Sequence, residues 1–319
     1  MSLTNFPNGV TSFGVPVLPV GVSFAKNAKR FFVDASLGSD GNDGLSVNSP
    51  IATIQKAVDM CTDGAGDSIF VAPGTYAENV VITSKDYISI IGAVIPGYAK
   101  PDVAPTTGIA LNCVTSQGLV LKHMRFVSED SDTVVNQGNG FHFSDCVFDG
   151  TSGQAATEAN LRLVGNADDD SFTASEGRVI DCMFRGCGGD ALIFQHANAP
   201  NGVGISDVEV IGCRFYGNTG DDIATAANTS GGGPGIGINV NFLLHECRFM
   251  SVDKTVYIDM DQVAAGGGVG TTNTGLLSGN WFADDAALDA TKIDISGTNY
   301  RFVGNFNAIG VVDGSSFDN

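Results

Sequence analysis

The sequence predicts an all-β fold, a single-stranded right-handed parallel β-helix whose short strands wind into a solenoid of stacked coils. Two observations predict it: a template that recurs along the chain, and the many Gly, Asn, Asp and Ser residues between its copies, which favour tight turns. The 319 residues include 42 Gly and are 43% hydrophobic, as in chains that fold around a core. We expect a β-helix domain at 26–319 and an extended N-terminal arm at 1–25.

The template reads apolar, variable, apolar, polar, polar or Gly, Cys, variable, Phe. Because alternate side chains of a strand share a face, stacked copies should form a Cys ladder and a Phe ladder inside the solenoid. The copies occupy 119–129, 141–153, 177–189, 208–220, 242–254 and 275–287. The structural ladders comprise Cys146, Cys182, Cys213 and Cys247, with Phe148, Phe184, Phe215 and Phe249. Spacing varies more than the template does, so the Gly-rich inserts at 228–237 and 263–275 should be loops on one side.

The laddered Cys could instead be a metal or redox site. No CxxC occurs, Cys182 and Cys187 are five residues apart, and each laddered Cys has a Phe two residues later. We therefore interpret these Cys as small buried side chains, and we expect no metal, cofactor or catalytic site.

The first coil should begin with a strand at Phe31–Val33, followed by a helix from Ile51 to about Cys61 that covers the end of the solenoid. Ser49 is the expected N-cap, and Pro50 suits the first helical position. Short strands are expected next at 68–71, 78–82 and 87–91.

Charge and targeting signals exclude several classes of protein. The net charge of −19 would repel a phosphate backbone, so nucleic acid is not an expected partner. Pro and Gly interrupt every apolar run near the N-terminus, and we predict neither a secretion signal nor a membrane anchor. Seven Cys cannot all pair within one chain, which favours folding in the cytoplasm.

Two segments resemble known families. FFVDASLGSDGNDGLSVNSPIATIQKAVD, followed by IFVAPGTYAENVVI, resembles the opening of pectate-lyase-like right-handed β-helix proteins, a fold that hosts enzymes and structural proteins alike. LTNFPNGVTSFGVPVLP is similar to N-terminal segments of virion proteins in tailed bacteriophages. Together they imply a capsid decoration (cement) protein, usually a homotrimer. Its partner-binding residues would be Phe6, Pro7, Phe13, Val15, Pro16, Val17 and Leu18.

Several Arg, Asp and His residues could serve in catalysis, but each also suits a structural role. A lyase would need acidic side chains that hold Ca²⁺ and an Arg or Lys as base, and the basic candidates are Arg162, Arg178, Arg185, Arg214, Arg248 and Arg301. Arg214 and Arg248 should point outward one coil apart, which suits simple outer-face charge. Asp221 and Asp222 could be a hydrolase pair, but they follow a Gly and suit a solvated turn. The remaining acids (168–170, 259, 261, 284–285) are expected in loops, and His123, His142, His196 and His245 are expected to be packed or at the surface.

The leading hypothesis is a non-enzymatic virion protein on the capsid exterior of a tailed bacteriophage, assembled in the host cytoplasm. Its arm would bind the major capsid protein, and its β-helix would project as a knob, without contact with nucleic acid or membrane. The alternative is a carbohydrate-active β-helix (tailspike depolymerase or polysaccharide lyase) or a host-adhesion fibre component. A single Trp, Trp281, and no dense aromatic stripe outside the ladder count against a carbohydrate groove.

Overall fold

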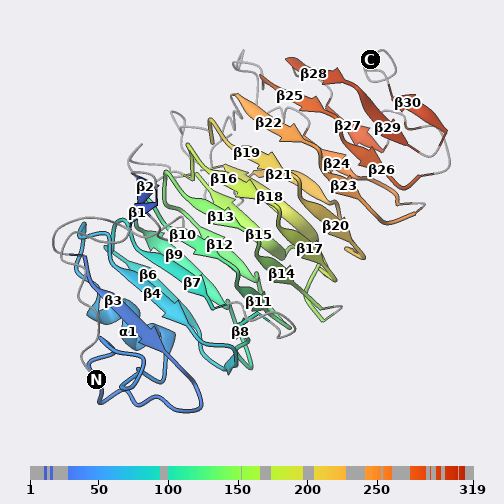
Figure 1. The fold of residues 1–319 in the computed structure, drawn as a ribbon. Helices are drawn as coiled ribbons and strands as arrows, with labels where there is room; N and C mark the ends of the chain where they lie inside the picture. Colours follow the sequence, from blue (N-terminus) through green and yellow to red (C-terminus); the bar gives the residue numbers. More distant parts are fainter. Residues whose placement is uncertain are drawn as a thin grey trace.

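The chain forms a right-handed parallel β-helix, as predicted (Figure 1). The computed structural model describes residues 11–12, 15–16, 28–93, 100–151, 153–165, 174–196, 205–227, 241–252, 254–260, 274–284, 288, 292–295, 299–307 and 309–312. Apart from the two end coils, each coil contributes one strand to each of three parallel sheets, here named sheets I, II and III in the order in which the chain visits them.

The strands stack from the N-terminal to the C-terminal coil as follows. Sheet I contains β3 (Arg30–Val33), β4 (Ser68–Val71), β7 (Ser89–Gly92), β10 (Val120–Lys122), β13 (His142–Ser144), β16 (Arg178–Ile180), β19 (Glu209–Ile211), β22 (Phe242–His245), β25 (Thr274–Ser278) and β28 (Asn299–Val303). Sheet II contains β5 (Thr75–Tyr76), β8 (Asp102–Val103), β11 (Arg125–Val127), β14 (Val147–Asp149), β17 (Met183–Arg185), β20 (Arg214–Tyr216), β23 (Arg248–Phe249), β26 (Trp281–Phe282), β29 (Asn305–Asn307) and the antiparallel β30 (Gly310–Val312). Sheet III contains β6 (Val80–Thr83), β9 (Leu111–Thr115), β12 (Val134–Asn136), β15 (Ala159–Val164), β18 (Asp190–His196), β21 (Ile223–Ala227), β24 (Ile258–Asp259) and β27 (Ile293–Asp294).

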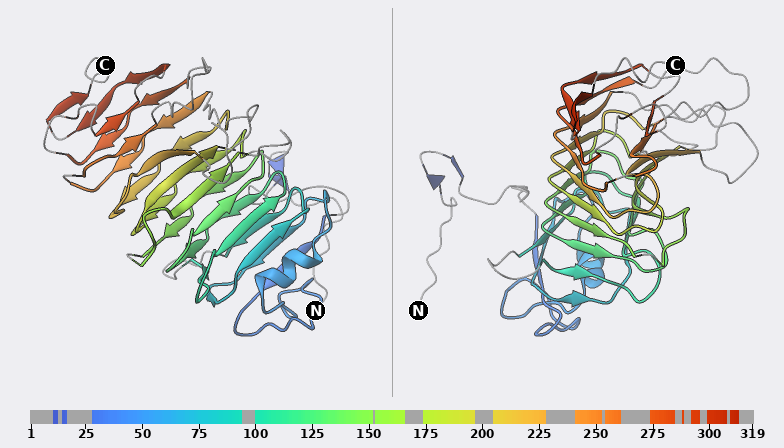
Figure 2. Two further views of the ribbon diagram at one scale, coloured as in Figure 1. Left: turned by 180° about the vertical axis from the view of Figure 1, so that it is seen from behind. Right: turned by 90° about the vertical axis from the view of Figure 1, so that its right-hand side faces the viewer.

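The helix α1 (Ile54–Met60) lies at the N-terminal end of the stack and packs against β3, β4 and β6 (Figure 2). The predicted start of this helix, with Ser49 as N-cap and Pro50 in the first position, was wrong. Thr53 is the N-cap, because its Oγ1 accepts a hydrogen bond from the Lys56 amide at 3.3 Å. Ile51 cannot be helical, since its amide donates to the Phe32 carbonyl and its own carbonyl accepts from the amide of residue 34, which continues the strand pairing of β3.

Both predicted ladders are confirmed. Successive Phe side chains pair in register across sheet II, and the rings of Phe148, Phe184, Phe215 and Phe249 stack with centroids 4.9 to 5.0 Å apart. The four laddered Cys are free thiols buried in the same core. Their predicted role as small buried side chains is therefore what the structure shows.

Each template copy is two strands rather than one, which the alternation argument did not predict. The position before the Cys adopts the left-handed conformation, with φ of 50° at Asp145, 54° at Asp181 and 53° at Glu246. This residue turns the chain through a corner, so the first half of each copy lies in sheet I and the second half in sheet II. Both halves keep their apolar side chains inside.

The two Gly-rich inserts lie almost wholly outside the described residues. Only residues 274 and 275 of the second insert are described, and they begin β25, so the predicted placement of both loops lies outside the described residues. Of the arm, only the short antiparallel pair β1 (Thr11–Ser12) and β2 (Val15–Pro16) is described. No helix in the described part of the chain is long and apolar enough to cross a membrane.

Candidate functional site

All eight Arg of the chain lie on strands. On the outer face of sheet II, the Arg side chains of the coils nearer the N-terminus (the lower coils in Figure 1) form a ladder of ion pairs with Asp. Arg125 lies 2.9 Å from Asp102 and 2.6 Å from Asp149, and Arg185 lies 2.6 Å from the same Asp149 oxygen. In these coils the positive charges of the sheet are balanced by the protein itself.

Among the described residues, this ladder of ion pairs does not continue into the coils nearer the C-terminus, the upper coils in Figure 1. The strand registers place Arg214 beside Arg248, Arg248 beside Trp281, and Trp281 beside Phe306 in one outward column. Neither Arg214 nor Arg248 forms an ion pair within the described residues, and both side chains are exposed. We call these four residues the Arg–aromatic strip.

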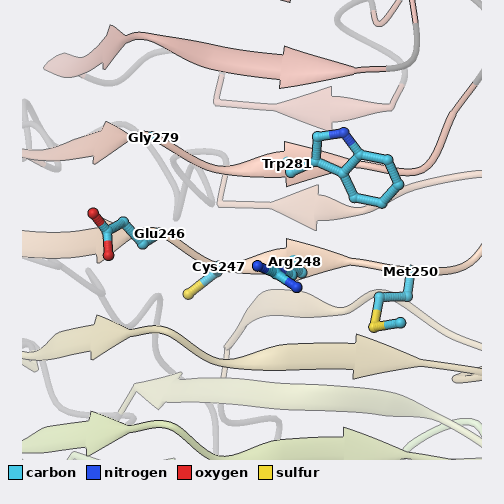
Figure 3. Close-up of a pocket in the computed structure, with 6 residues that line it drawn as sticks. All are labelled: Glu246, Cys247, Arg248, Met250, Gly279 and Trp281. Atoms are coloured by element: carbon cyan, nitrogen blue, oxygen red, sulfur yellow. The ribbon is translucent and has the colours of Figure 1, made fainter.

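The strip borders a shallow hollow of about 570 Å³. Arg248 from β23 and Trp281 from β26 line it, together with Met250 and, at the corner toward sheet I, Glu246 and Gly279 (Figure 3). The hollow therefore offers a cation and an aromatic side chain on neighbouring strands, with a carboxylate at its edge.

Exposed apolar side chains continue along the same face. Trp281 is 42% exposed, Phe306 45% and Met250 41%, and Tyr216 on β20 is 57% exposed. These side chains do not form a dense aromatic stripe, but Trp281 does have an exposed aromatic neighbour, Phe306, which the sequence analysis did not predict. The signal for the column was present in the repeat alignment, since Arg214, Arg248 and Trp281 all stand between the Cys position and the Phe position of their copies.

The corner between sheets II and III holds the other notable polar group. Asp222 was expected in a solvated turn but is fully buried, with its Oδ1 2.6 Å from Nζ of Lys254. Its neighbour Asp221 is partly exposed, and its amide donates to Oδ1 of Asp190 at 2.7 Å. Burial, with the charges of Asp190 and Asp259, raises the pKa of Asp221 to about 7.

The other predicted candidates do not assemble into one site. Arg162 pairs with Asp132 at 2.7 Å, and Arg178 pairs with Glu209 at 2.9 Å. The side chain of Asp284 is buried and pairs with that of Lys292. Among the residues that the structure describes, no cluster of three His, Cys, Asp or Glu is arranged to hold a metal ion.

The predicted arm contacts lie outside the described residues, apart from the backbone of β2. Phe6, Pro7, Phe13, Val17 and Leu18 are not described. For Val15 and Pro16 only the pairing with β1 is given. Docking of the arm on a capsid stays a prediction.

The comparisons with known proteins find the same fold in solved structures of other proteins. No family model and no curated protein matches the sequence. The pectin methylesterase of Aspergillus niger, in deglycosylated form, matches 95% of this chain and 90% of its own at 14% identity and a TM-score of 0.56. Pectate lyase Pel9A matches 91% and 79% at 14% identity and 0.48. PfbA, a surface adhesin of Streptococcus pneumoniae, matches 80% and 76% at 11% identity and 0.47.

The comparison bears on two expectations. The prediction that the chain is not an enzyme is contradicted, because a solved structure that shares its fold over 95% of the chain is an enzyme. A capsid decoration role gains no support from the comparison. At such low identity the likeness shows the fold alone, so any activity must be argued from the side chains of this chain.

Proposed function

We propose that the protein recognises an anionic glycan along the outer face of sheet II. The observation that carries this proposal is the column in which Arg214 and Arg248, neither of which has an ion pair among the described residues, are followed by Trp281 and Phe306. A guanidinium binds carboxylate or sulfate through paired hydrogen bonds, and an aromatic face packs against the C–H face of a sugar ring.

The ion-pair ladder below the strip explains the preference for negative charge. Asp149 satisfies both Arg125 and Arg185, whereas Arg214 and Arg248 have no carboxylate in the corresponding positions. An acidic sugar would supply the missing group. Neighbouring strands are about 4.8 Å apart, comparable to the advance of one sugar along an extended chain, so successive acidic sugars could meet successive Arg.

The net charge decides between a glycan and a nucleic acid. Arg and aromatic side chains also suit single-stranded nucleic acid, but the chain carries −19 overall. A nucleic acid carries a phosphate at every nucleotide and would be repelled along its whole length by this net charge, whereas the proposed glycan needs acidic groups only opposite Arg214 and Arg248.

Calorimetry with defined oligosaccharides tests the proposal. An acidic uronic hexasaccharide should bind the full chain, and its affinity should fall as salt is added. Arg248→Gln and Trp281→Ala should each weaken binding at least tenfold. Arg178→Gln, a change to an ion-paired Arg on sheet I, is the matched control and should leave binding unchanged. Equal affinity for a neutral hexasaccharide, or no loss in Arg248→Gln, would refute the anionic site.

The phage location is a second proposal and is compatible with the first. The arm's resemblance to segments of phage virion proteins favours it, and a glycan-recognising β-helix on a particle could act on the surface of the host. Co-sedimentation with phage heads, using the full chain and a chain without residues 1–25, tests it. Binding that depends on the arm supports capsid attachment, and binding by neither chain removes it.

A further inference from the structure

Three polar side chains converge at the corner between sheets I and II, beside the hollow. Oγ of Ser278 lies 2.9 Å from Nδ1 of His245, and Nε2 of the same ring lies 3.4 Å from Oε1 of Glu246. A hydroxyl, an imidazole and a carboxylate in this order form the arrangement that activates a serine: the imidazole removes the hydroxyl proton, and the carboxylate stabilises the resulting imidazolium.

The β-helix builds this arrangement from two consecutive coils. His245 ends β22, Ser278 ends β25, and the register pairs them directly. Glu246 and Gly279 then take left-handed conformations, with φ of 53° and 66°, and turn the chain into sheet II. A Cβ at Gly279 would lie 3.6 Å from Cγ of Glu246 and 3.7 Å from Cε1 of His245, so the imidazole and the carboxylate converge on this glycine.

The proton positions suit a general base. With the Nε2 proton directed at Glu246, Nδ1 accepts the hydrogen bond of Ser278 Oγ, and the carboxylate favours this tautomer. The opposite tautomer would donate from Nδ1 to the Ser278 carbonyl, 3.1 Å away. The contact between Nε2 and Oε1 is longer than a good hydrogen bond, and contacts of this kind tighten when substrate binds.

All three residues are at least partly exposed. The side chain of His245 is 40% exposed and that of Glu246 is 69% exposed, and Ser278 is half-buried. Glu246 and Gly279 line the same hollow as Arg248 and Trp281 (Figure 3). Ser278 directly precedes Gly279 and His245 directly precedes Glu246, so the three polar side chains lie at the edge of this hollow, where Arg248 offers positive charge to a bound ligand.

We propose that Ser278, His245 and Glu246 form an acyl-transfer site that hydrolyses an ester on a sugar. Ser278 Oγ attacks the ester carbonyl carbon while its proton moves to His245 Nδ1. The bond between the carbonyl carbon and the sugar oxygen then breaks, and that departing oxygen takes the proton from Nδ1. Water gives a proton to Nδ1 and attacks the acyl-serine; the bond from the acyl carbon to Ser278 Oγ breaks, and this oxygen takes the proton from Nδ1, which releases the carboxylic acid and free Ser278. The choice of a sugar ester rests on the proposed function, whereas the reaction does not.

The test uses the full-length chain with 4-nitrophenyl acetate and with a fluorophosphonate probe whose attachment is mapped by mass spectrometry. The wild type should hydrolyse the ester and carry the probe on Ser278. Ser278→Ala and His245→Gln should lower the rate at least 100-fold, and Glu246→Gln at least tenfold. Ser144→Ala is the matched control, because Ser144 ends β13 in an equivalent outward position with no histidine hydrogen-bonded to its Oγ among the described residues.

Two results would overturn the proposal: hydrolysis by Ser278→Ala at the wild-type rate, or no probe on Ser278 in the wild type. Folding of each variant is checked by circular dichroism, and a misfolded Ser278→Ala is replaced by Ser278→Thr, whose branched hydroxyl should also lose most of the rate. Ester hydrolysis without binding of the acidic hexasaccharide would support this site and refute the glycan proposal. The reverse result would do the opposite.

Discussion

Replacing Lys254 with Met tests how the solenoid keeps a carboxylate inside. Asp222 is fully buried, and its Oδ1 accepts hydrogen bonds from Nζ of Lys254 at 2.6 Å and from Nδ2 of Asn218 at 2.9 Å. Its Oδ2 has no hydrogen-bond partner among the described residues. Without the ammonium, one amide would face the buried charge alone, and breaking a buried pair in this way costs about 3–5 kcal/mol.

The cost should depend on pH. Burial raises the pKa of Asp222, while Lys254 opposes that rise, so Lys254→Met raises this pKa further. The unpaired carboxyl then takes up a proton as the pH falls, and neutralisation removes most of the penalty. The destabilisation should therefore be largest at pH 8 and smaller at pH 5.

Urea denaturation followed by circular dichroism measures the effect at both pH values. Asp222→Asn and the double variant Lys254→Met/Asp222→Asn complete the cycle. The double variant should lose less stability than the sum of the two single variants, because no unpaired charge remains. Additive losses, or a cost below about 1 kcal/mol for Lys254→Met at pH 8, would refute the argument that the pair neutralises a buried charge.

Three further predictions concern single positions. Phe215→Ala should lower the free energy of unfolding by about 3–5 kcal/mol, because its ring is stacked on both sides in the ladder, whereas Ala at the exposed Tyr216 should change it by less than about 0.5 kcal/mol in urea denaturation. Thr53→Ala should cost about 1 kcal/mol through loss of the cap of α1, and Thr53→Ser should restore most of it in the same assay. Asp221 has a pKa of about 7 in the folded protein. The stability that its protonated form contributes is therefore present below pH 3.8 and is lost as the pH rises through 7. At pH values above 7, Asp221→Asn should raise the midpoint temperature of unfolding relative to the wild type, whereas at pH 4 it should have little effect.

The core was predictable because its information lies in the repeat itself. Cys and Phe recur at fixed positions of each copy, and any parallel stacking of the copies brings them together. The corner was missed because a polar residue such as Asp145 or Asp181 has two readings: an outward position of a continuous strand, or a left-handed residue that ends it. The choice depends on how far the chain must turn to close a coil, which no single copy contains.

The candidate sites were partly predictable. The outward column of Arg214 and Arg248 was deduced from the repeat, but Trp281 was counted as an isolated residue although it occupies the same position one copy later. Ser278 and His245 are 33 residues apart, and no local motif joins them. Their contact depends on the length of one coil and on the register between β22 and β25. Because the loops between template copies differ in length, no fixed spacing in the sequence predicts this register.

A comparison between coils indicates where the function resides. The backbone repeats from coil to coil, so only side chains distinguish the lower half from the upper half. In the lower coils, Asp149 satisfies two Arg, and Asp145 accepts from His123 and Lys100. Such surface ion pairs contribute little to the free energy of unfolding, so their absence from the upper coils would destabilise the protein little. In the coils nearer the C-terminus, Arg248 has no ion pair among the described residues, and the imidazole of His245 faces the hydroxyl of Ser278. Both features lie at the corner between sheets I and II. A ligand that spans this corner could pair with the guanidinium of Arg248 and at the same time contact His245 and Ser278.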